Sequence, residues 1–156
     1  MADVRVDLAT VHDQTALGQL LELYAHDFSE LTLADVGDDG RFGWNDLGRY
    51  WREPDRHPFV FRVDRRLAGF ALVRSGPPHD MAEFFVLRKY RRRGVGRDAA
   101  RAVFARFPGE WQVREQFENT AAIAFWRSAI PVPFEEAPND EGPVQRFRID
   151  GGPPTA

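Results

Sequence analysis

The first third of the chain combines a strand pattern with a helical pattern. Every second residue of the range 4–8 is apolar, which predicts a short strand with one buried face. From Val11 to Phe28 apolar residues recur every three or four positions, so we expect a helix with one apolar stripe. Tyr24 lies on that stripe, which favours a place in the core over a catalytic role. A short helix is expected from Asp46 to Arg52, and Pro54 accounts for its end.

The remainder of the chain alternates between strands and helices. Phe59–Val63 and Leu67–Val73 flank a polar turn and predict a hairpin, and the apolar run Met81–Leu87 predicts a central strand covered on both faces. Two helices and two strands follow, expected at Asp98–Phe107, Trp111–Arg114, Ala121–Ile130 and Gln145–Ile149. Hairpin-linked strands followed by two crossover helices indicate a mixed α/β or α+β sheet with helices packed on it.

Length and composition indicate one soluble domain. With 156 residues, 43% of them hydrophobic, the chain can bury a sizeable core, so we expect one domain over residues 1–150 and a flexible tail over 151–156. No signal-peptide pattern opens the sequence and no apolar run approaches the roughly 18 residues of a membrane helix. A cytoplasmic protein without membrane contact is therefore expected. Cysteine is absent, which excludes disulfides, thiolate zinc sites and cysteine nucleophiles.

Charge is distributed unevenly along the chain. Residues 1–55 contain twelve acidic and four basic side chains, whereas residues 88–106 contain eight basic and one acidic. Such a chain could bring a cation and an anion to one place, although two separately solvated surfaces would give the same pattern. The acidic range 35–40 has some features of a calcium loop. Gly37 cannot supply a side-chain ligand, however, and Asp46 stands where a bidentate Glu is required, so no metal site is expected.

The stretch Tyr90–Arg97 joins the central apolar strand to the next helix through a turn with two glycines and four arginines. The first N–H groups of a helix lack helical partners, and the helix dipole adds partial positive charge there. The turn therefore suits a phosphate or pyrophosphate group. It is not a Walker loop, because no Gly-Lys-Ser/Thr follows, and it lacks the three glycines of the dinucleotide fingerprint.

Two segments carry a more specific signature. Arg91–Gly96 fits the pattern Arg/Gln-x-x-Gly-x-Gly/Ala at every defined position, and Asn119–Trp126 opens a later helix with Asn, small residues and an aromatic. In this order they resemble the motifs of the GNAT superfamily of acyl-CoA N-acyltransferases. The resemblance implies a mixed, mostly antiparallel central sheet with helices on both faces. It also implies an N-acetyltransferase that takes its acetyl group from acetyl-CoA.

The resemblance assigns the coenzyme A site to the turn and to the strand before it. Backbone amides of the turn would bind the pyrophosphate, and the strand would pair with the pantetheine arm. A bulge in that strand would direct a backbone N–H near Phe85 or Val86 at the thioester carbonyl. Asn119 would touch the arm, with a plain helix cap as the alternative. The expected cofactor-binding residues are Phe84, Phe85, Val86, Arg91, Arg92, Arg93, Gly94, Val95, Gly96, Arg97, Asn119 and Trp126.

The implied reaction is direct attack of an amine on the thioester, and it requires a general base for the amine proton. Glu83 is the candidate base, because it lies on the strand that would carry the thioester, beside apolar residues that could raise its pKa. His79 and Asp80, in the loop before that strand, are weaker candidates.

The group that protonates the leaving thiolate is the main departure from the family. Many members use a Tyr seven residues after the Asn, and here that position is Trp126, whose indole cannot usefully give up its proton. Three explanations stay open: the thiolate leaves unaided, Tyr90 or Tyr50 supplies the proton, or the protein does not catalyse transfer.

Acceptor recognition is implied for the segments 27–51 and 134–145. The first segment is acidic and rich in aromatic residues, which suits a cationic amine, either a small molecule or a peptide. The expected acceptor-binding residues are Asp35, Phe42, Trp44 and Tyr50.

Two other functions are alternatives to acetyl transfer. Arg88–Arg93 could bind nucleic acid, but the net charge of −3 and the lack of a base-stacking motif argue against a nucleic-acid partner. The second alternative is a catalytically inactive acyl-CoA-binding sensor or interaction protein of the same fold. Either a monomer or a homodimer is compatible with the sequence.

Overall fold

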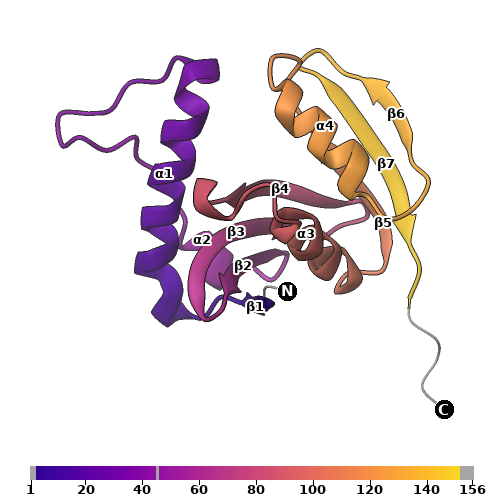
Figure 1. Cartoon of the computed structure of the whole chain (residues 1–156), viewed down its shortest axis with the longest axis horizontal. Helices are drawn as coiled ribbons and strands as arrows, with labels where there is room; N and C mark the ends of the chain where they lie inside the picture. Colours follow the sequence, from indigo (N-terminus) through magenta and orange to yellow (C-terminus); the bar gives the residue numbers. More distant parts are fainter. Residues whose placement is uncertain (1–2, 45, 152–156) are drawn as a thin grey trace.

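The computed structural model describes residues 3–44 and 46–151, which form a seven-stranded sheet covered by helices on both faces (Figure 1). The strands are β1 (Val4–Leu8), β2 (Arg56–Val63), β3 (Arg66–Arg74), β4 (His79–Val86), β5 (Gly109–Arg114), β6 (Glu135–Pro138) and β7 (Pro143–Ile149). The helices are α1 (Gln14–Thr32), α2 (Arg49–Arg52), α3 (Val95–Ala105) and α4 (Thr120–Ala129), with short 3-10 turns at Val11–Asp13 and Arg88–Tyr90. In the order β1-β2-β3-β4-β5-β7-β6, all neighbours are antiparallel except β4 and β5, so the expected mixed, mostly antiparallel sheet is confirmed.

The observed elements differ from the predicted ones in a few places. Helix α1 continues past Phe28 to Thr32, and α3 begins at Val95 rather than at Asp98. Strand β6 was missed because all four of its residues are exposed and carry no hydrophobic signal, so only its pairing with β7 defines it. Apart from Gly151, the tail expected at 151–156 lies outside the described residues. Within the described ranges, no helix has the length and apolar character needed to cross a membrane.

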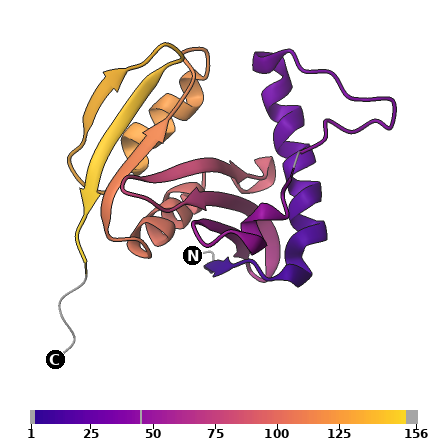
Figure 2. The ribbon, with the colours of Figure 1, turned by 180° about the vertical axis from the view of Figure 1, so that it is seen from behind.

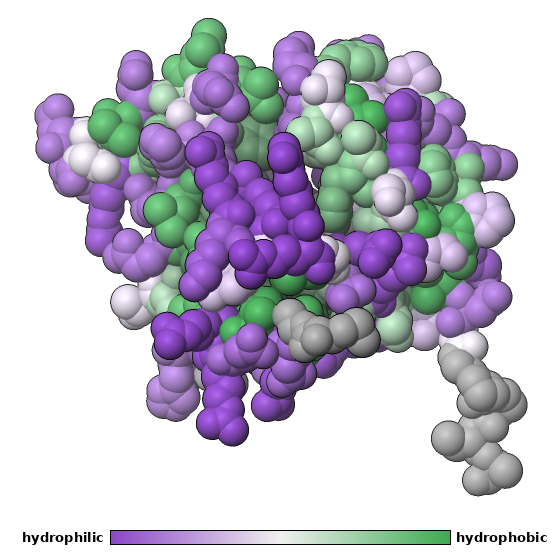
Figure 3. Space-filling view, viewed as in Figure 1, coloured by the Kyte–Doolittle hydropathy of each residue, from purple (hydrophilic) through white to green (hydrophobic). Residues whose placement is uncertain are grey.

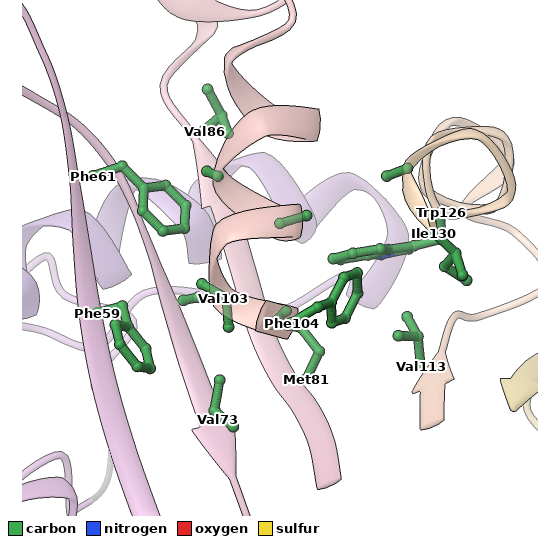
Figure 4. Packing of buried hydrophobic residues seen from close by; sticks show 14 of the residues in the cluster. Phe59, Phe61, Val73, Met81, Val86, Val103, Phe104, Val113, Trp126 and Ile130 are labelled. Atoms are coloured by element: carbon green, nitrogen blue, oxygen red, sulfur yellow. The ribbon is translucent and has the colours of Figure 1, made fainter. Parts of the chain in front are cut away.

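The sheet separates two apolar cores. On one face, Leu17 and Leu21 of α1 pack with Phe85 of β4. On the other face, Trp126 extends from α4 toward Phe104 of α3, with 6.1 Å between the ring centroids (Figure 4). Each large side chain buried in this way contributes about 1.5–3 kcal/mol to folding. Because the two cores lie on opposite faces of the sheet, β4 is packed between α1 and α4.

Strands β4 and β5 pair over only two residues, and the sheet opens beyond them. The register contains His79 opposite Trp111 and Asp80 opposite Gln112. A bulge in β4 at Ala82 follows directly. Figures 1 and 2 show β5, β7 and β6 turned away from β1–β4. Among the described residues, the second half of β4 therefore has a strand neighbour only on its β3 side.

The His79 imidazole stabilises the end of the opening at which β4 and β5 are still paired. Its Nδ1 accepts the backbone N–H of Gly76 at 3.0 Å, and its Nε2 lies 2.9 Å from the carbonyl oxygen of Pro108. Since a carbonyl can only accept, Nε2 carries the proton and both ring nitrogens are engaged. The ring also packs 5.3 Å from that of Trp111. His79 was a weaker candidate for the general base, and the structure gives it this structural position instead.

A partly buried polar cluster ties the outer strands to α4. The Gln145 amide donates to Glu115 and to Glu136, each at 2.8 Å, and Arg127 forms a two-pronged ion pair with Glu136 at 2.9 and 2.7 Å. This hydrogen bonding from Arg127 lowers the pKa of Glu136 to about 2, whereas burial raises the pKa of Glu115 to about 7. Glu115 Oε2 and Gln145 Oε1 are buried acceptors without a donor in the described part of the chain. If the Glu115 carboxyl group carried a proton, it would supply a hydrogen-bond donor to this pair of acceptors.

Two glycine substitutions are expected to change stability in opposite directions. A Cβ on Gly69 of β3 would overlap the carbonyl oxygen of Phe85, so Gly69→Ala should lower the free energy of unfolding by at least about 1–3 kcal/mol. A Cβ on Gly18 in α1 would lie 4.0 Å from its nearest neighbour, Leu47, so Gly18→Ala should raise that free energy by about 0.5–1 kcal/mol. Urea unfolding measures both, and effects of the same sign would contradict this packing.

Glu115→Gln is expected to flatten the pH dependence of stability. The pKa of Glu115 is raised from 4.5 to about 7, so its stabilising contribution is complete below pH 4.5 and is lost as pH rises through about 7. The variant stays neutral throughout. Between about pH 5 and pH 8 the wild type should therefore lose roughly 1–3 kcal/mol more stability than the variant in urea unfolding. Parallel curves for the two proteins would show that Glu115 is not a buried titrating group.

Candidate active site

Two cavities meet where the sheet opens. The turn cavity, of about 710 Å³, is bordered by Arg91, Arg92, Gly94, Gly96 and Arg97 at the start of α3. The loop cavity, of about 520 Å³, reaches the α1–α2 connection at Phe42, Gly43 and Trp44. Figure 3 shows hydrophilic side chains gathered in the middle of this face of the molecule. Six residues border both cavities and define their junction: Tyr24, Phe28, Phe84, Asn119, Ala122 and Trp126.

The turn cavity ends at backbone amides. Arg92 and Gly94 both adopt left-handed conformations, with φ of 62° and 79°, and α3 starts at Val95. The first N–H groups of α3 have no carbonyl to pair with within the helix. A Cβ on Gly96 would lie 2.9 Å from Cε1 of Phe125, so α4 approaches this turn as closely as it does only because Gly96 has no side chain. The geometry fits an anionic group such as a pyrophosphate.

The Arg91 side chain is engaged in holding the site together. Its Nε donates to the carbonyl oxygen of Val86 at 2.8 Å, and its Nη2 donates to Asp27 of α1 at 2.5 Å. Asp27 also pairs with Arg88 at 3.1 Å. Of the turn's other arginines, Arg92 and Arg97 border the cavity, whereas the exposed Arg93 does not. The buried Val95 does not border it either. Side-chain contacts to a bound anion are thus available mainly from Arg92 and Arg97.

The open edge of β4 presents backbone groups to the junction. The N–H of Leu87 donates to Ala68 of β3 at 2.8 Å. The backbone N–H and C=O groups of alternate residues in a strand point to opposite edges. Those of Phe85 therefore also point toward β3, whereas those of Phe84 and Val86 point into the opening. The bond from Arg91 to the Val86 carbonyl agrees with this direction. Of the two expected oxyanion donors, only Val86 therefore has its N–H directed into the site.

A carboxylate and a phenol meet at the junction. Glu83 of β4 accepts a hydrogen bond from the Tyr24 hydroxyl of α1. Burial raises the pKa of Glu83 to about 7, against the opposing effect of this hydrogen bond; Asp80 raises it further and Arg114 lowers it. Burial and the nearby charge of Glu83 raise the pKa of Tyr24. Glu83 is thus partly ionised near neutral pH, which suits a general base.

The Tyr24 hydroxyl is the functional group that sequence reasoning missed. Tyr24 was assigned to the core because it lies on the apolar stripe of α1, and its ring does pack there, 5.6 Å from Phe70 and 5.7 Å from Phe85. Helical periodicity identifies the buried face of a helix. It does not show that a hydroxyl on that face meets a carboxylate on β4. A tyrosine within such a stripe was the signal that the sequence offered.

The structure places the other candidate acids away from the junction. Tyr90 is buried in the core beneath α3 and α4, and Tyr50 in the core beneath α1 and α2, and neither borders the turn cavity or the loop cavity. Trp126 borders both cavities but is largely buried, with its ring 5.0 Å from that of Phe84. Asp80, the other weak candidate for the base, is buried and pairs with Arg114 at 2.8 Å. Trp126 is thus a wall of the junction.

Asn119 caps α4, as its alternative interpretation proposed. Its Oδ1 accepts the backbone N–H of Ala122 at 3.1 Å, and its side chain still borders both cavities. The cap explains why an asparagine stands at this position without any reference to a ligand.

The expected acceptor residues are only partly brought together. Phe42 and Trp44 border the loop cavity, whereas Asp35 is exposed outside it and Tyr50 is buried below α2. Their loop is tied to α1 by Glu22, whose carboxylate accepts the backbone N–H groups of Phe42 and Gly43 at 2.8 and 3.0 Å. The acidic residues that do border this cavity are Glu83, Glu115 and Glu141, together with the basic Arg114.

Comparison with solved structures identifies the fold. The ribosomal-protein-S18-alanine N-acetyltransferase of Escherichia coli matches with a TM-score of 0.68 and 17% identity over 97% of both chains. The PaiA N-acetyltransferase of Thermoplasma acidophilum, solved with coenzyme A, matches with a TM-score of 0.67 and 11% identity, covering 94% of this chain and 99% of that one. An aminoglycoside acetyltransferase from a soil metagenomic sample, solved with sisomicin, matches with a TM-score of 0.65 and 17% identity, covering 87% and 93%.

Sequence comparison adds the family. Among curated proteins, no relative matches the chain. Residues 17–129 match the profile of the Acetyltransferase (GNAT) family, and this range includes most of α1, the glycine turn before α3 and Asn119. Because the match spans more than half of the sequence, the chain belongs to the Acetyltransferase (GNAT) family.

Proposed function

We propose that this protein is an N-acetyltransferase that transfers the acetyl group of acetyl-CoA to a primary amine. The observation that carries the proposal is the position of Glu83, a half-buried carboxyl group with a pKa of about 7, which borders the acidic loop cavity and is hydrogen-bonded to Tyr24 at the junction with the turn cavity. The coenzyme A complex of the Thermoplasma neighbour supports the choice of donor.

Acetyl-CoA, the proposed acyl donor, would bind in the turn cavity. The free amides from Gly94 to Arg97 would hold its pyrophosphate, with Arg92 and Arg97 beside it. The open edge of β4 would bind the pantetheine arm through the backbone groups of Phe84 and Val86. The thioester would then lie at the junction, because the amine must reach it from the loop cavity.

The chemistry asks for a base and an oxyanion donor. Glu83 would accept the proton of the attacking amine, and the Val86 N–H would stabilise the charge that develops on the carbonyl oxygen. Holding both reactants at the junction supplies a further part of the acceleration through proximity. Glu83 is the group whose loss should be felt most.

The acceptor proposed is a cationic amine. The loop cavity combines the carboxylates of Glu83, Glu115 and Glu141 with the aromatic rings of Phe42 and Trp44, and such a surface favours ammonium groups. Asp35 does not belong to this site. The sisomicin complex of the metagenomic neighbour is consistent with an amine of this kind.

A catalytically inactive acyl-CoA-binding protein is the alternative function. Trp126 favours it, because an indole at the family's tyrosine position supplies no proton to a leaving thiolate. Binding of acetyl-CoA without release of free thiol, across polyamines, aminoglycosides, amino acids and basic peptides, would select this alternative over transfer.

Glu83→Gln should reduce kcat/KM by about 10²–10⁴-fold while leaving acetyl-CoA affinity unchanged. In the wild type, kcat/KM should rise with pH through about 7 as Glu83 ionises, and this limb should disappear in the variant. Thiol release measures turnover, and calorimetry measures binding. If the variant kept wild-type turnover, Glu83 would not be the base.

Trp44→Ala should raise the KM for the amine by roughly tenfold, corresponding to about 1–2 kcal/mol of cation–π and apolar contact, without changing acetyl-CoA affinity. The matched control is Val36→Ala, which removes apolar bulk from the same loop at a residue outside the cavity. Equal effects of the two variants on the amine KM would place the acceptor elsewhere.

A further inference from the structure

Cleavage of a thioester leaves a thiolate, and the family's usual proton donor is missing. The chain has three tyrosines. Tyr50 and Tyr90 are buried in the two cores and border neither cavity, while Trp126 stands at the usual position without a transferable proton. Tyr24 is the remaining phenol, and it is also the one at the junction.

The ring of Tyr24 is held in one place by its neighbours. It packs edge-on against Phe28 and Phe70, with centroids 5.0 and 5.6 Å away, and lies 5.7 Å from Phe85 and 6.3 Å from Trp44. Contacts on several sides restrict the ring, so its hydroxyl has a defined position between α1 and β4.

That position connects the base to the donor side. Glu83 borders the loop cavity but not the turn cavity, whereas Tyr24 borders both. The hydrogen bond from the Tyr24 hydroxyl to Glu83 Oε2 links the two groups. A proton that reaches Glu83 from the amine therefore has a path toward the thioester through one hydroxyl.

We propose that the Tyr24 hydroxyl protonates the departing thiolate and is itself reprotonated by Glu83. This inference rests on the proposed acetyl-transfer function. Glu83 accepts the proton of the amine and then returns a proton to Tyr24. The phenol of α1 thereby acts in place of the tyrosine that α4 lacks.

The protons balance over one turnover. An ammonium acceptor loses two protons on becoming an amide, of which the first passes to water through the open loop cavity. After the amine nitrogen bonds to the carbonyl carbon, that nitrogen gives its second proton to Glu83. As the carbon–sulfur bond breaks, sulfur takes the Tyr24 proton and the Tyr24 oxygen takes the proton held by Glu83. The products are the amide, the free thiol and ionised Glu83.

The acidities agree with this direction of transfer. Tyr24 has a raised pKa, so a lasting phenolate is disfavoured and loss of its proton must be coupled to replacement from Glu83. The net transfer runs from a carboxyl group with a pKa of about 7 to the thiolate of a simple thiol, whose pKa is about 8.5. That direction is favourable.

The test compares two acyl donors in Tyr24→Phe. With acetyl-CoA, single-turnover transfer to an amine that the wild type uses should slow by about 10–10³-fold. With the selenium analogue of acetyl-CoA, whose selenolate leaving group stays ionised at neutral pH and needs no proton, the variant should come within about threefold of the wild type. Glu83→Gln should be slow with both donors, because the amine must still lose its proton. Tyr90→Phe removes a core hydroxyl and should match the wild type with both.

Two further measurements separate the outcomes. Calorimetry should give Tyr24→Phe the wild-type affinity for coenzyme A, and a ¹³C NMR titration should show the pKa of Glu83 rising, because the lost hydrogen bond had lowered it. Equal defects with both donors would reduce Tyr24 to positioning Glu83, and an unchanged rate with acetyl-CoA would remove it from the reaction. An unmoved Glu83 titration would contradict the link itself. If the wild type turns over no amine at all, the proposed function fails first, and this inference with it.

Discussion

The two-residue pairing of β4 with β5 is the constraint on which the rest of the site depends. Had the strands continued side by side, β5 would have covered the backbone groups of Phe84 and Val86. The opening exposes those groups, and α1 and α4 wall it from opposite faces of the sheet. The anion-binding turn follows at one end and the acidic loop cavity at the other. The chemistry proposed for this chain is therefore located by the sheet topology.

Polar side chains keep that opening in register. Arg91 links the last residue of β4 to Asp27 of α1, and the Tyr24–Glu83 hydrogen bond connects the same two elements further along. On the opposite side, Gln145 of β7 donates hydrogen bonds to Glu115, directly after β5, and to Glu136 of β6. Arg91 illustrates how a residue of a binding signature can act through its side chain as a structural brace.

Sequence reasoning found the parts of the site that depend on the main chain. The glycines at 94 and 96 and the Asn119 cap have short-range causes, which a local pattern records. Hydrophobic periodicity likewise located the longer helices and most of the strands. Tertiary contacts between polar groups left no such trace, so Tyr24 was placed in the core and Tyr90 at the site. Asp35 was chosen for its charge, but its loop is anchored by Glu22 in a way that leaves Asp35 outside the cavity.

The most direct test of the account is an amide NMR titration of the wild-type protein with coenzyme A. Saturable shifts are expected at the backbone amides of Phe84, Val86 and Gly94–Arg97, with little change at Phe85, whose N–H pairs with β3. Saturation without shifts at these amides, or no binding at all, would contradict the assignment of the opening between β4 and β5 as the acyl-donor site.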